Sequence, residues 1–139
     1  METNPQITGT VLVVDDESSV AALTCDVVDK VFPGLSARLV NSGEGCLAYL
    51  QGTGNFSDRA KFPYPVAVLL DLKMPGVDGF DVLAWMRDNP PHHRVPVIVL
   101  TATTDAAMAK RAYGLGARSF LHKPFEAADL VNAFKGLPS

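Results

Sequence analysis

The chain has 139 residues, of which 47% are hydrophobic and 19% are charged. This composition is typical of a globular domain with a sizeable core and argues against a disordered protein. The net charge of −3 argues against nonspecific binding to nucleic acid, which needs a basic surface. No apolar run approaches the length of a membrane span, and the N-terminus METNPQITGT lacks the features of a signal peptide. We therefore expect a soluble cytoplasmic protein.

Apolar segments that are typical of β-strands alternate with helical patterns along the chain. The strand-like segments are residues 11–14, 37–40, 66–70, 95–100 and 120–121. The helical segments carry apolar stripes that we expect to be core residues. In chain order the stripes are Val20, Leu23, Val27 and Val31; Leu47 and Leu50 between Gly43 and Gly52; Phe80, Leu83 and Met86; Met108, Ala112 and Leu115; and Leu130, Phe134 and Leu137. Asp78 and Asp105 are placed to cap the third and fourth helices.

The alternation of strands and helices predicts an α/β fold in which helices cover both faces of a parallel sheet. Three strands are apolar throughout, as strands buried on both faces must be, whereas the strand at 37–40 is charged and the strand at 120–121 is short. These two strands suit the edges, which gives a flavodoxin-like, doubly wound, five-stranded sheet in the order 2-1-3-4-5 with five helices. We expect one domain at residues 7–136, short tails at 1–6 and 137–139, no output domain, and a polar surface loop from Thr53 to Pro65.

Acidic side chains follow two strands that are expected to be neighbours in the sheet. Asp71 comes directly after five apolar residues, and Asp15 and Asp16 end the first strand. At an effective dielectric constant near 20, two unit charges about 5 Å apart repel by roughly 3 kcal/mol, so three such groups need neutralisation. A hard divalent cation with oxygen ligands provides it, and Mg²⁺ suits best because it leaves coordination positions for phosphate oxygens.

Two further strand ends bring a hydroxyl and an ammonium group to the same edge. The fourth strand ends at Thr101, and the fifth leads to Lys123. Taken singly, residues 15–18 are also compatible with a helix cap, Asp71 with a turn residue, Thr101 with a strand-end cap and Lys123 with a surface charge. Taken together, they fit a phosphoryl group attached to Asp71. Lys123 and the cation would each neutralise one of its oxygens, and Thr101 would donate a hydrogen bond to a third.

The segments VLVVDDE, VLLDLKMPGVDG, VIVLTA and FLHKPF resemble, in order and spacing, the receiver domain of two-component response regulators, and the match covers nearly the whole chain. The resemblance implies a signalling phosphoprotein in which Asp71 accepts a phosphoryl group from a histidine of a sensor histidine kinase or a histidine phosphotransfer protein. It also implies Mg²⁺ (or Mn²⁺) bound directly by Asp16, Asp71 and the backbone carbonyl of Lys73, with Asp15 acting through a water.

By the same resemblance, Thr101 and Lys123 contact the phosphoryl oxygens, and phosphorylation moves Thr101 so that Phe120 turns inward. The Lys123–Pro124 bond is implied to be cis, against the usual preference for trans. The chain is similar to stand-alone receivers of the chemotaxis and phytochrome-associated types, which act through protein contacts. We therefore expect a downstream protein target and a homodimer through helix 4, strand 5 and helix 5. Such a receiver catalyses its own phosphorylation and dephosphorylation but is not otherwise an enzyme.

Three other classes of protein are alternatives. A phosphatase or phosphotransferase with an aspartyl nucleophile typically needs a second carboxylate two residues later, where this chain has Lys73. A nucleotide-binding protein needs a Gly-rich phosphate loop, and none follows the first strand. A module that only binds other proteins would have no need of Asp71, Thr101 and Lys123 in combination.

The remaining residues with reactive or metal-binding side chains are expected to be structural. Cys25 and Cys46 lack metal-ligand spacing and fit buried reduced thiols. His92 and His93 fit a solvated loop. His122 is expected to face away from the acidic edge, because alternate strand residues face opposite sides.

Overall fold

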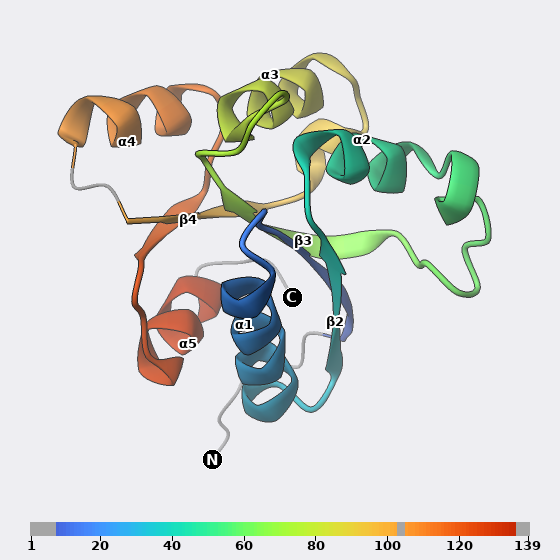
Figure 1. Cartoon of the computed structure of the whole chain (residues 1–139), viewed down its shortest axis with the longest axis horizontal. Coiled ribbons are helices and arrows are strands. Elements are labelled where there is room, and N and C mark those ends of the chain that lie inside the picture. Colours follow the sequence, from blue (N-terminus) through green and yellow to red (C-terminus); the bar gives the residue numbers. More distant parts are fainter. Residues whose placement is uncertain (1–7, 103–104, 136–139) are drawn as a thin grey trace.

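The computed structural model describes residues 8–102 and 105–135, which form alternating strands and helices (Figure 1). The strands are β1 (Gly9–Val14), β2 (Leu35–Val40), β3 (Pro65–Asp71), β4 (Val97–Thr101) and β5 (Ser119–His122). The α-helices are α1 (Ser18–Val31), α2 (Gly43–Gln51), α3 (Gly79–Asp88), α4 (Ala106–Gly114) and α5 (Ala127–Lys135). Two 3₁₀ helices, Gly54–Phe56 and His92–Arg94, precede β3 and β4. The predicted domain boundaries at residues 7 and 136, both tails and Leu137 lie outside the described residues.

The five strands are parallel, and their order is β2-β1-β3-β4-β5, as predicted. Val14, the last residue of β1, pairs with Val40 of β2 and with Leu70 of β3, and Thr101 pairs with His122. The carboxyl ends of the strands therefore share one edge of the sheet. The winding reverses between β1 and β3, which is where open sheets of this kind bind their ligands.

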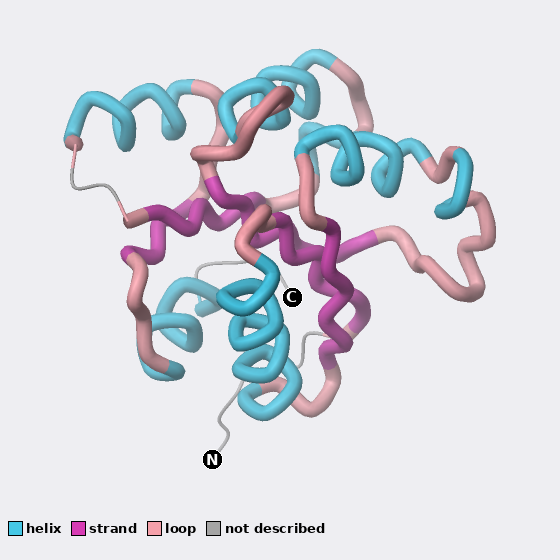
Figure 2. The backbone as a smooth tube through the Cα atoms, viewed as in Figure 1, coloured by secondary structure: helices cyan, strands magenta, loops and turns pink. Residues whose placement is uncertain are grey.

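Helices cover both faces of the sheet, with α1 and α5 on one face and α2, α3 and α4 on the other (Figures 1 and 2). Alternate residues of β1 enter different cores: Val11 and Val13 pack on the α1 side, whereas Leu12 and Val14 pack on the α2 side. All four are completely buried, as a central parallel strand requires. Among the described helices, none combines the length and apolar character that a membrane crossing needs.

Side-chain caps fix the starts of three helices. The Asp78 carboxylate accepts a hydrogen bond from the Asp81 amide at 2.9 Å, and the Asp81 carboxylate accepts one from the Asp78 amide at 3.0 Å. The Asp105 carboxylate accepts from the Ala107 amide, so both predicted caps are confirmed. Ser42 caps α2 in the same way, a role that the sequence analysis did not assign.

The buried face of α1 differs from the predicted stripe. Ala21, Thr24 and Val28 are its buried residues, whereas Leu23 is 65% exposed. The helix therefore contacts the sheet through a face that carries small side chains, and the Thr24 hydroxyl bonds to the Val20 carbonyl at 3.1 Å. The prediction of a core role for Leu23 is wrong.

The segment before β3 lies mostly at the surface, as predicted, but part of it packs against the core. Phe56 and Phe62 pack against the ring of the buried Tyr49, with centroid distances of 5.0 and 6.1 Å. The Arg59 guanidinium donates to the carbonyl oxygens of Tyr49, Leu50 and Phe62 at 2.9–3.1 Å. The Tyr49 and Leu50 carbonyls belong to the last turn of α2, so Arg59 ties this segment to that helix as a folded extension of the α2 side of the core.

The two neighbouring histidines differ in their surroundings. His93 is exposed, in agreement with the prediction of a solvated loop, but His92 is half-buried. Its ring stacks on Trp85 at 4.9 Å, and its Nδ1 bonds to the Tyr64 hydroxyl at 2.5 Å. The expectation of solvent exposure is therefore wrong for His92, which joins the segment before β3 to the end of α3.

Both cysteines are free thiols. Burial raises the pKa of the Cys46 thiol to about 12 and that of the half-buried Cys25 thiol to about 11. Two nearby carboxylates add to the rise at Cys25. Thiols with such pKa values are poor nucleophiles and poor metal ligands at neutral pH, which agrees with a structural role.

Candidate functional site

A pocket of about 370 Å³ opens at the carboxyl edge of the sheet. Its lining comes from the ends of four strands and the residues that follow them: Asp16, Glu17, Asp71, Lys73, Thr101, Ala102 and Lys123. The pocket lies where the winding reverses, because β1 and β3 are adjacent there. The four strand ends named by the sequence analysis therefore meet at one place.

Three carboxylates occupy one side of this pocket. Asp15 is completely buried and Asp71 is 7% exposed, whereas Asp16 is exposed to solvent. One oxygen from each of the three lies within 4.8 Å of the others. A cluster of carboxylate oxygens that is partly buried and partly open is a donor set that suits a hard divalent cation with some retained waters. The residues present therefore fit Mg²⁺ or Mn²⁺.

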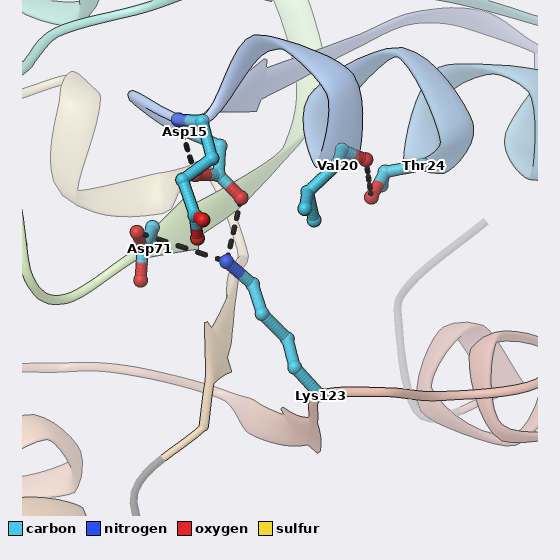
Figure 3. A network of polar contacts seen from close by, with 6 residues as sticks. Asp15, Val20, Thr24, Asp71 and Lys123 are labelled. Atoms are coloured by element: carbon cyan, nitrogen blue, oxygen red, sulfur yellow. Dashed lines mark hydrogen bonds and ion pairs between the residues drawn. The ribbon is translucent and has the colours of Figure 1, made fainter.

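Lys123 supplies a positive charge that faces Asp15 and Asp71 (Figure 3). Its Nζ lies 2.6 Å from Asp15 Oδ2 and 3.7 Å from Asp71 Oδ2. The other oxygen of Asp15 accepts a hydrogen bond from the Glu17 amide at 3.0 Å. Both oxygens of the buried Asp15 are thus satisfied, so its charge is held by a matched set of donors.

Two expectations about the end of β5 are confirmed. The Lys123–Pro124 peptide bond is cis, and His122 is exposed whereas Lys123 turns into the pocket. The Lys123 amide donates to the Thr101 carbonyl at 2.8 Å, which fixes the end of β5 against the end of β4.

The electrostatic balance of the pocket leaves Asp71 incompletely neutralised. Burial raises the pKa of Asp71 from 3.8 to about 6, and Lys123 opposes that rise. Asp15 and Asp16 raise the pKa further by repulsion, and a hydrogen bond from the Lys73 amide lowers it. The Lys123 ammonium pairs with two of the three clustered carboxylates, so the pocket favours an added cation.

Thr101 and Phe120 lie on the neighbouring strands β4 and β5. Thr101 is 2% exposed at the end of β4, where it lines the pocket. Phe120 is half-buried on β5, pairs with Val99, and places its ring 5.0 Å from the ring of Tyr113 on α4. The hydroxyl thus borders the acidic site, and the aromatic ring contacts the helix that follows β4.

A second groove adjoins the pocket and was missed by the sequence analysis. It has a volume of about 430 Å³, shares Glu17, Ala102 and Lys123 with the acidic pocket, and is otherwise lined by Val20, Leu23, Thr24, Val27, Pro124 and Phe125. The exposed Leu23 is one of its apolar residues. The sequence does carry a sign of this groove, because α1 has more large apolar residues than its buried face needs. All of them were expected to lie in the core.

Comparison with known proteins identifies the family. The family model described as the response regulator receiver domain matches residues 11–135. The chain belongs to this family. Receiver domains are parts of two-component systems, and phosphorylation and Mg²⁺ binding are features of the family.

Several relatives of this receiver match it over nearly their whole length. Response regulator Rcp1 of Synechocystis is 30% identical over 138 residues, which cover 99% of this chain and 90% of that protein. The crystal structure of a response regulator in red light signaling of R. palustris is 33% identical, with a TM-score of 0.79, and the match covers 94% of this chain and 98% of that one. The Mn²⁺-bound form of response regulator Rcp1 is 27% identical, with a TM-score of 0.72 and coverage of 94% and 99%.

Proposed function

We propose that this receiver accepts a phosphoryl group on Asp71, in a reaction that depends on Mg²⁺ (or Mn²⁺), from a phosphohistidine of a sensor histidine kinase or a histidine phosphotransfer protein. The observation that carries the proposal is the position of Asp71 within one pocket. Its carboxylate lies beside two other carboxylates and 3.7 Å from an ammonium group. Anionic ligands for a cation and a cationic group for a phosphoryl oxygen are both needed for phosphoryl transfer to a carboxylate.

Each side chain of the pocket has a separate role in the reaction. An oxygen of Asp71 attacks phosphorus, the bond between phosphorus and the donor imidazole nitrogen breaks, and that nitrogen keeps the electron pair and takes a proton. Lys123 neutralises one phosphoryl oxygen, and Thr101 donates a hydrogen bond to another. Asp15, Asp16, Asp71 and the Lys73 carbonyl would hold the cation, which offsets the negative charge of the carboxylates and the phosphoryl group.

The same site accounts for dephosphorylation by the receiver itself. A water attacks the phosphorus of the acyl phosphate, the bond between phosphorus and the Asp71 oxygen breaks, and inorganic phosphate leaves. The carboxylate of Asp71 is restored with its electron pair. Lys123 and Thr101 hold the same phosphoryl oxygens in both directions, so no further active site is needed.

Phosphorylation would reach the surface through Thr101 and Phe120. The added group carries nearly two negative charges at neutral pH, which attract the Thr101 hydroxyl toward it. Movement of Thr101 leaves space that the half-buried Phe120 ring fills, which breaks its contact with Tyr113. Coupling of this kind is typically about 1–3 kcal/mol. The surface formed by α4, β5 and α5 would then bind a downstream protein or a second copy of the chain.

The groove between α1 and the β5–α5 connection suits the phosphodonor. It is apolar, it continues directly into the pocket that contains Asp71, and Leu23 is 65% exposed there. A helix of the donor that covers Leu23 would bring its phosphohistidine to the pocket and exclude water. Relatives in red light signaling and among bacteriophytochrome response regulators support a phytochrome-type sensor kinase as the donor. Such a pairing would put this receiver in the cytoplasm, with an output through protein contacts.

Incubation with a small phosphodonor such as acetyl phosphate tests the proposal. Intact-mass spectrometry should show a gain of one phosphoryl group in the presence of Mg²⁺, and the gain should disappear when EDTA removes the metal. Asp71→Asn should abolish it, whereas Asp26→Asn, an equal charge change on the exposed side of α1, should not. Equal labelling of Asp71→Asn and wild type would refute the role of Asp71.

A second variant tests the docking groove separately. Leu23→Asp should slow transfer from a phosphorylated histidine phosphotransfer protein at least tenfold, because it puts a charge into an apolar contact. Phosphorylation by acetyl phosphate should be unchanged, since the small donor does not need the groove. Equal rates of transfer from the protein donor to the variant and the wild type would remove α1 from the docking surface.

A further inference from the structure

α4 is held to the rest of the protein by few buried contacts. Among residues 106–114, all of which are described, only Ala112 is buried. Met108 is half-buried, and Tyr113 is 51% exposed. By contrast, five of the ten residues of α3 are buried, and its first turn carries a complete capping box. α3 is thus firmly anchored, whereas the position of α4 depends on contacts of partly exposed side chains.

One of those contacts joins α4 to α3. The guanidinium carbon of Arg111 lies 4.1 Å from the centroid of the Phe80 ring. Phe80 is 6% exposed and belongs to the anchored first turn of α3. A planar guanidinium stacked on an aromatic face gains both electrostatic attraction and packing. Arg111 therefore fastens a weakly packed helix to a rigid one.

The ring beneath Arg111 lies next to the backbone of the acceptor. Gly79, the residue before Phe80, donates its amide hydrogen to the Leu72 carbonyl at 3.0 Å. It packs so closely that a Cβ there would lie 2.5 Å from the Asp71 carbonyl oxygen. Contacts thus run without a gap from the backbone of Asp71, through Gly79 and Phe80, to Arg111 on α4. Arg111 also lines a groove of about 490 Å³ together with Lys73, two residues after the acceptor.

We propose that the stack of Arg111 on Phe80 is a clasp that holds α4 against α3 in the unphosphorylated protein and sets how readily α4 moves. The contact of Tyr113 with Phe120, at 5.0 Å, holds α4 against β5. Inward rotation of Phe120 releases that second contact, so that α4 is then held by the Arg111 clasp and by the packing of Met108 and Ala112 on the core. The clasp itself is independent of phosphorylation, whereas its regulatory effect depends on the proposed function.

Hydrogen exchange measured by mass spectrometry on the unphosphorylated protein tests the clasp. Arg111→Ala should speed exchange of the α4 amides about two- to fivefold, the effect expected from loss of an exposed cation–π contact. Peptides from β1 and β3 should be unchanged. Lys110→Ala is the matched control, because it removes an exposed cation from the adjacent position of the same helix. Equal α4 exchange in Arg111→Ala and wild type would overturn the proposal.

Two further variants show whether the ring and the guanidinium act as a pair. Phe80→Leu keeps an apolar side chain in the core but removes the aromatic face, so it should speed α4 exchange by a similar factor. In the double variant with Arg111→Ala, the effect should be no larger than in either single variant. Additive effects would mean that the two side chains act separately and would overturn the clasp. Arg111→Lys, which keeps the charge but loses the planar stack, should recover only part of the restraint.

The link to phosphorylation has its own measurement. If the conformation with a displaced α4 is the one that accepts the phosphoryl group more readily, removal of the clasp raises its population and with it the rate of labelling. Arg111→Ala should therefore be labelled by acetyl phosphate about two- to fivefold faster than wild type, and Lys110→Ala at the wild-type rate. Faster α4 exchange with unchanged labelling would overturn the regulatory role. Absence of labelling in wild type as well would instead contradict the proposed function and leave the exchange result on the clasp intact.

Discussion

Replacing Asp71 with asparagine is expected to stabilise the metal-free protein at neutral pH, although it removes the proposed phosphoacceptor. Burial raises the pKa of this carboxyl from 3.8 to about 6, Lys123 only partly opposes the rise, and Asp15 and Asp16 add to it. The ionised form is therefore less favourable in the folded protein than in the unfolded chain. An asparagine of nearly the same shape removes the charge and keeps the packing.

The size of the effect follows from the shift in pKa. A change from 3.8 to about 6 corresponds to at most about 3 kcal/mol, since one pKa unit is worth about 1.36 kcal/mol. Solvent in the open pocket screens the carboxylate, so we expect about 1–2 kcal/mol. The pKa of Asp71 is higher in the folded protein than in the unfolded chain. The stability that protonated Asp71 contributes is therefore fully present below about pH 4, the pKa of the unfolded state. It is lost as the pH rises to about 6 and remains lost above.

Urea unfolding in EDTA at pH 4.5 and pH 8 measures this difference, with the fluorescence of the single, half-buried Trp85 as the probe. Asp71→Asn should be more stable than wild type by about 1–2 kcal/mol at pH 8, and the gain should shrink markedly at pH 4.5. Asp26→Asn, with the same charge change, should show no such dependence. Mg²⁺ should stabilise wild type at pH 8 more than it stabilises Asp71→Asn. A variant that is no more stable than wild type at pH 8, or whose gain is the same at both pH values, would refute the reasoning.

Other parts of the fold give equally direct tests. Arg59→Ala should lower the free energy of unfolding by about 2 kcal/mol, because three hydrogen bonds to carbonyl oxygens are lost. Arg59→Lys should recover less than half of that loss. A loss below about 0.5 kcal/mol in Arg59→Ala would contradict the role of Arg59 in tying this segment to α2. Gly43→Ala should lower the free energy of unfolding by about 1–3 kcal/mol, since its Cβ would lie 2.1 Å from the Val77 carbonyl oxygen. The control Gly114→Ala adds a Cβ in open space and should change the free energy of unfolding by less than about 0.5 kcal/mol. Cys46, with its pKa raised to about 12 by burial, should resist iodoacetamide at pH 8 until urea is added, as peptide mass spectrometry would show.

The sheet and the assembly of the site could be predicted because they depend on burial patterns along single strands. Strands such as β1 are apolar on both faces and must be central, whereas the charged β2 and the short β5 end the sheet. Once the order is fixed, parallel strands bring their carboxyl ends to one edge. The convergence of Asp15, Asp71, Thr101 and Lys123 follows from that geometry alone.

The predictions on α1 and on the segment before β3 were partly wrong, because packing between elements decides which of their residues are buried. The pattern on α1 does not reveal that the helix meets the sheet through Ala21, Thr24 and Val28, which leaves Leu23 exposed. Similarly, the polar residues between Thr53 and Pro65 concealed two aromatic rings that pack on Tyr49. Their partners lie on another element, and periodicity within one segment carries no information about them.

The pairing of charges within the site is a further property that sequence cannot supply, and it bears on the mechanism. The Lys123 Nζ lies 2.6 Å from a carboxylate oxygen of the buried Asp15 but 3.7 Å from one of Asp71. Its charge therefore mainly neutralises Asp15, which water cannot reach. Asp71 is consequently left with a raised pKa and only a long contact, of 3.7 Å, to the Lys123 ammonium. A cation held by the carboxylates would offset the charge of Asp15 and so lower the cost of moving Lys123 toward a phosphoryl oxygen. On the proposed function, one lysine therefore balances a buried charge before phosphorylation and holds the phosphoryl group after it. A bound cation would make the exchange between the two roles favourable.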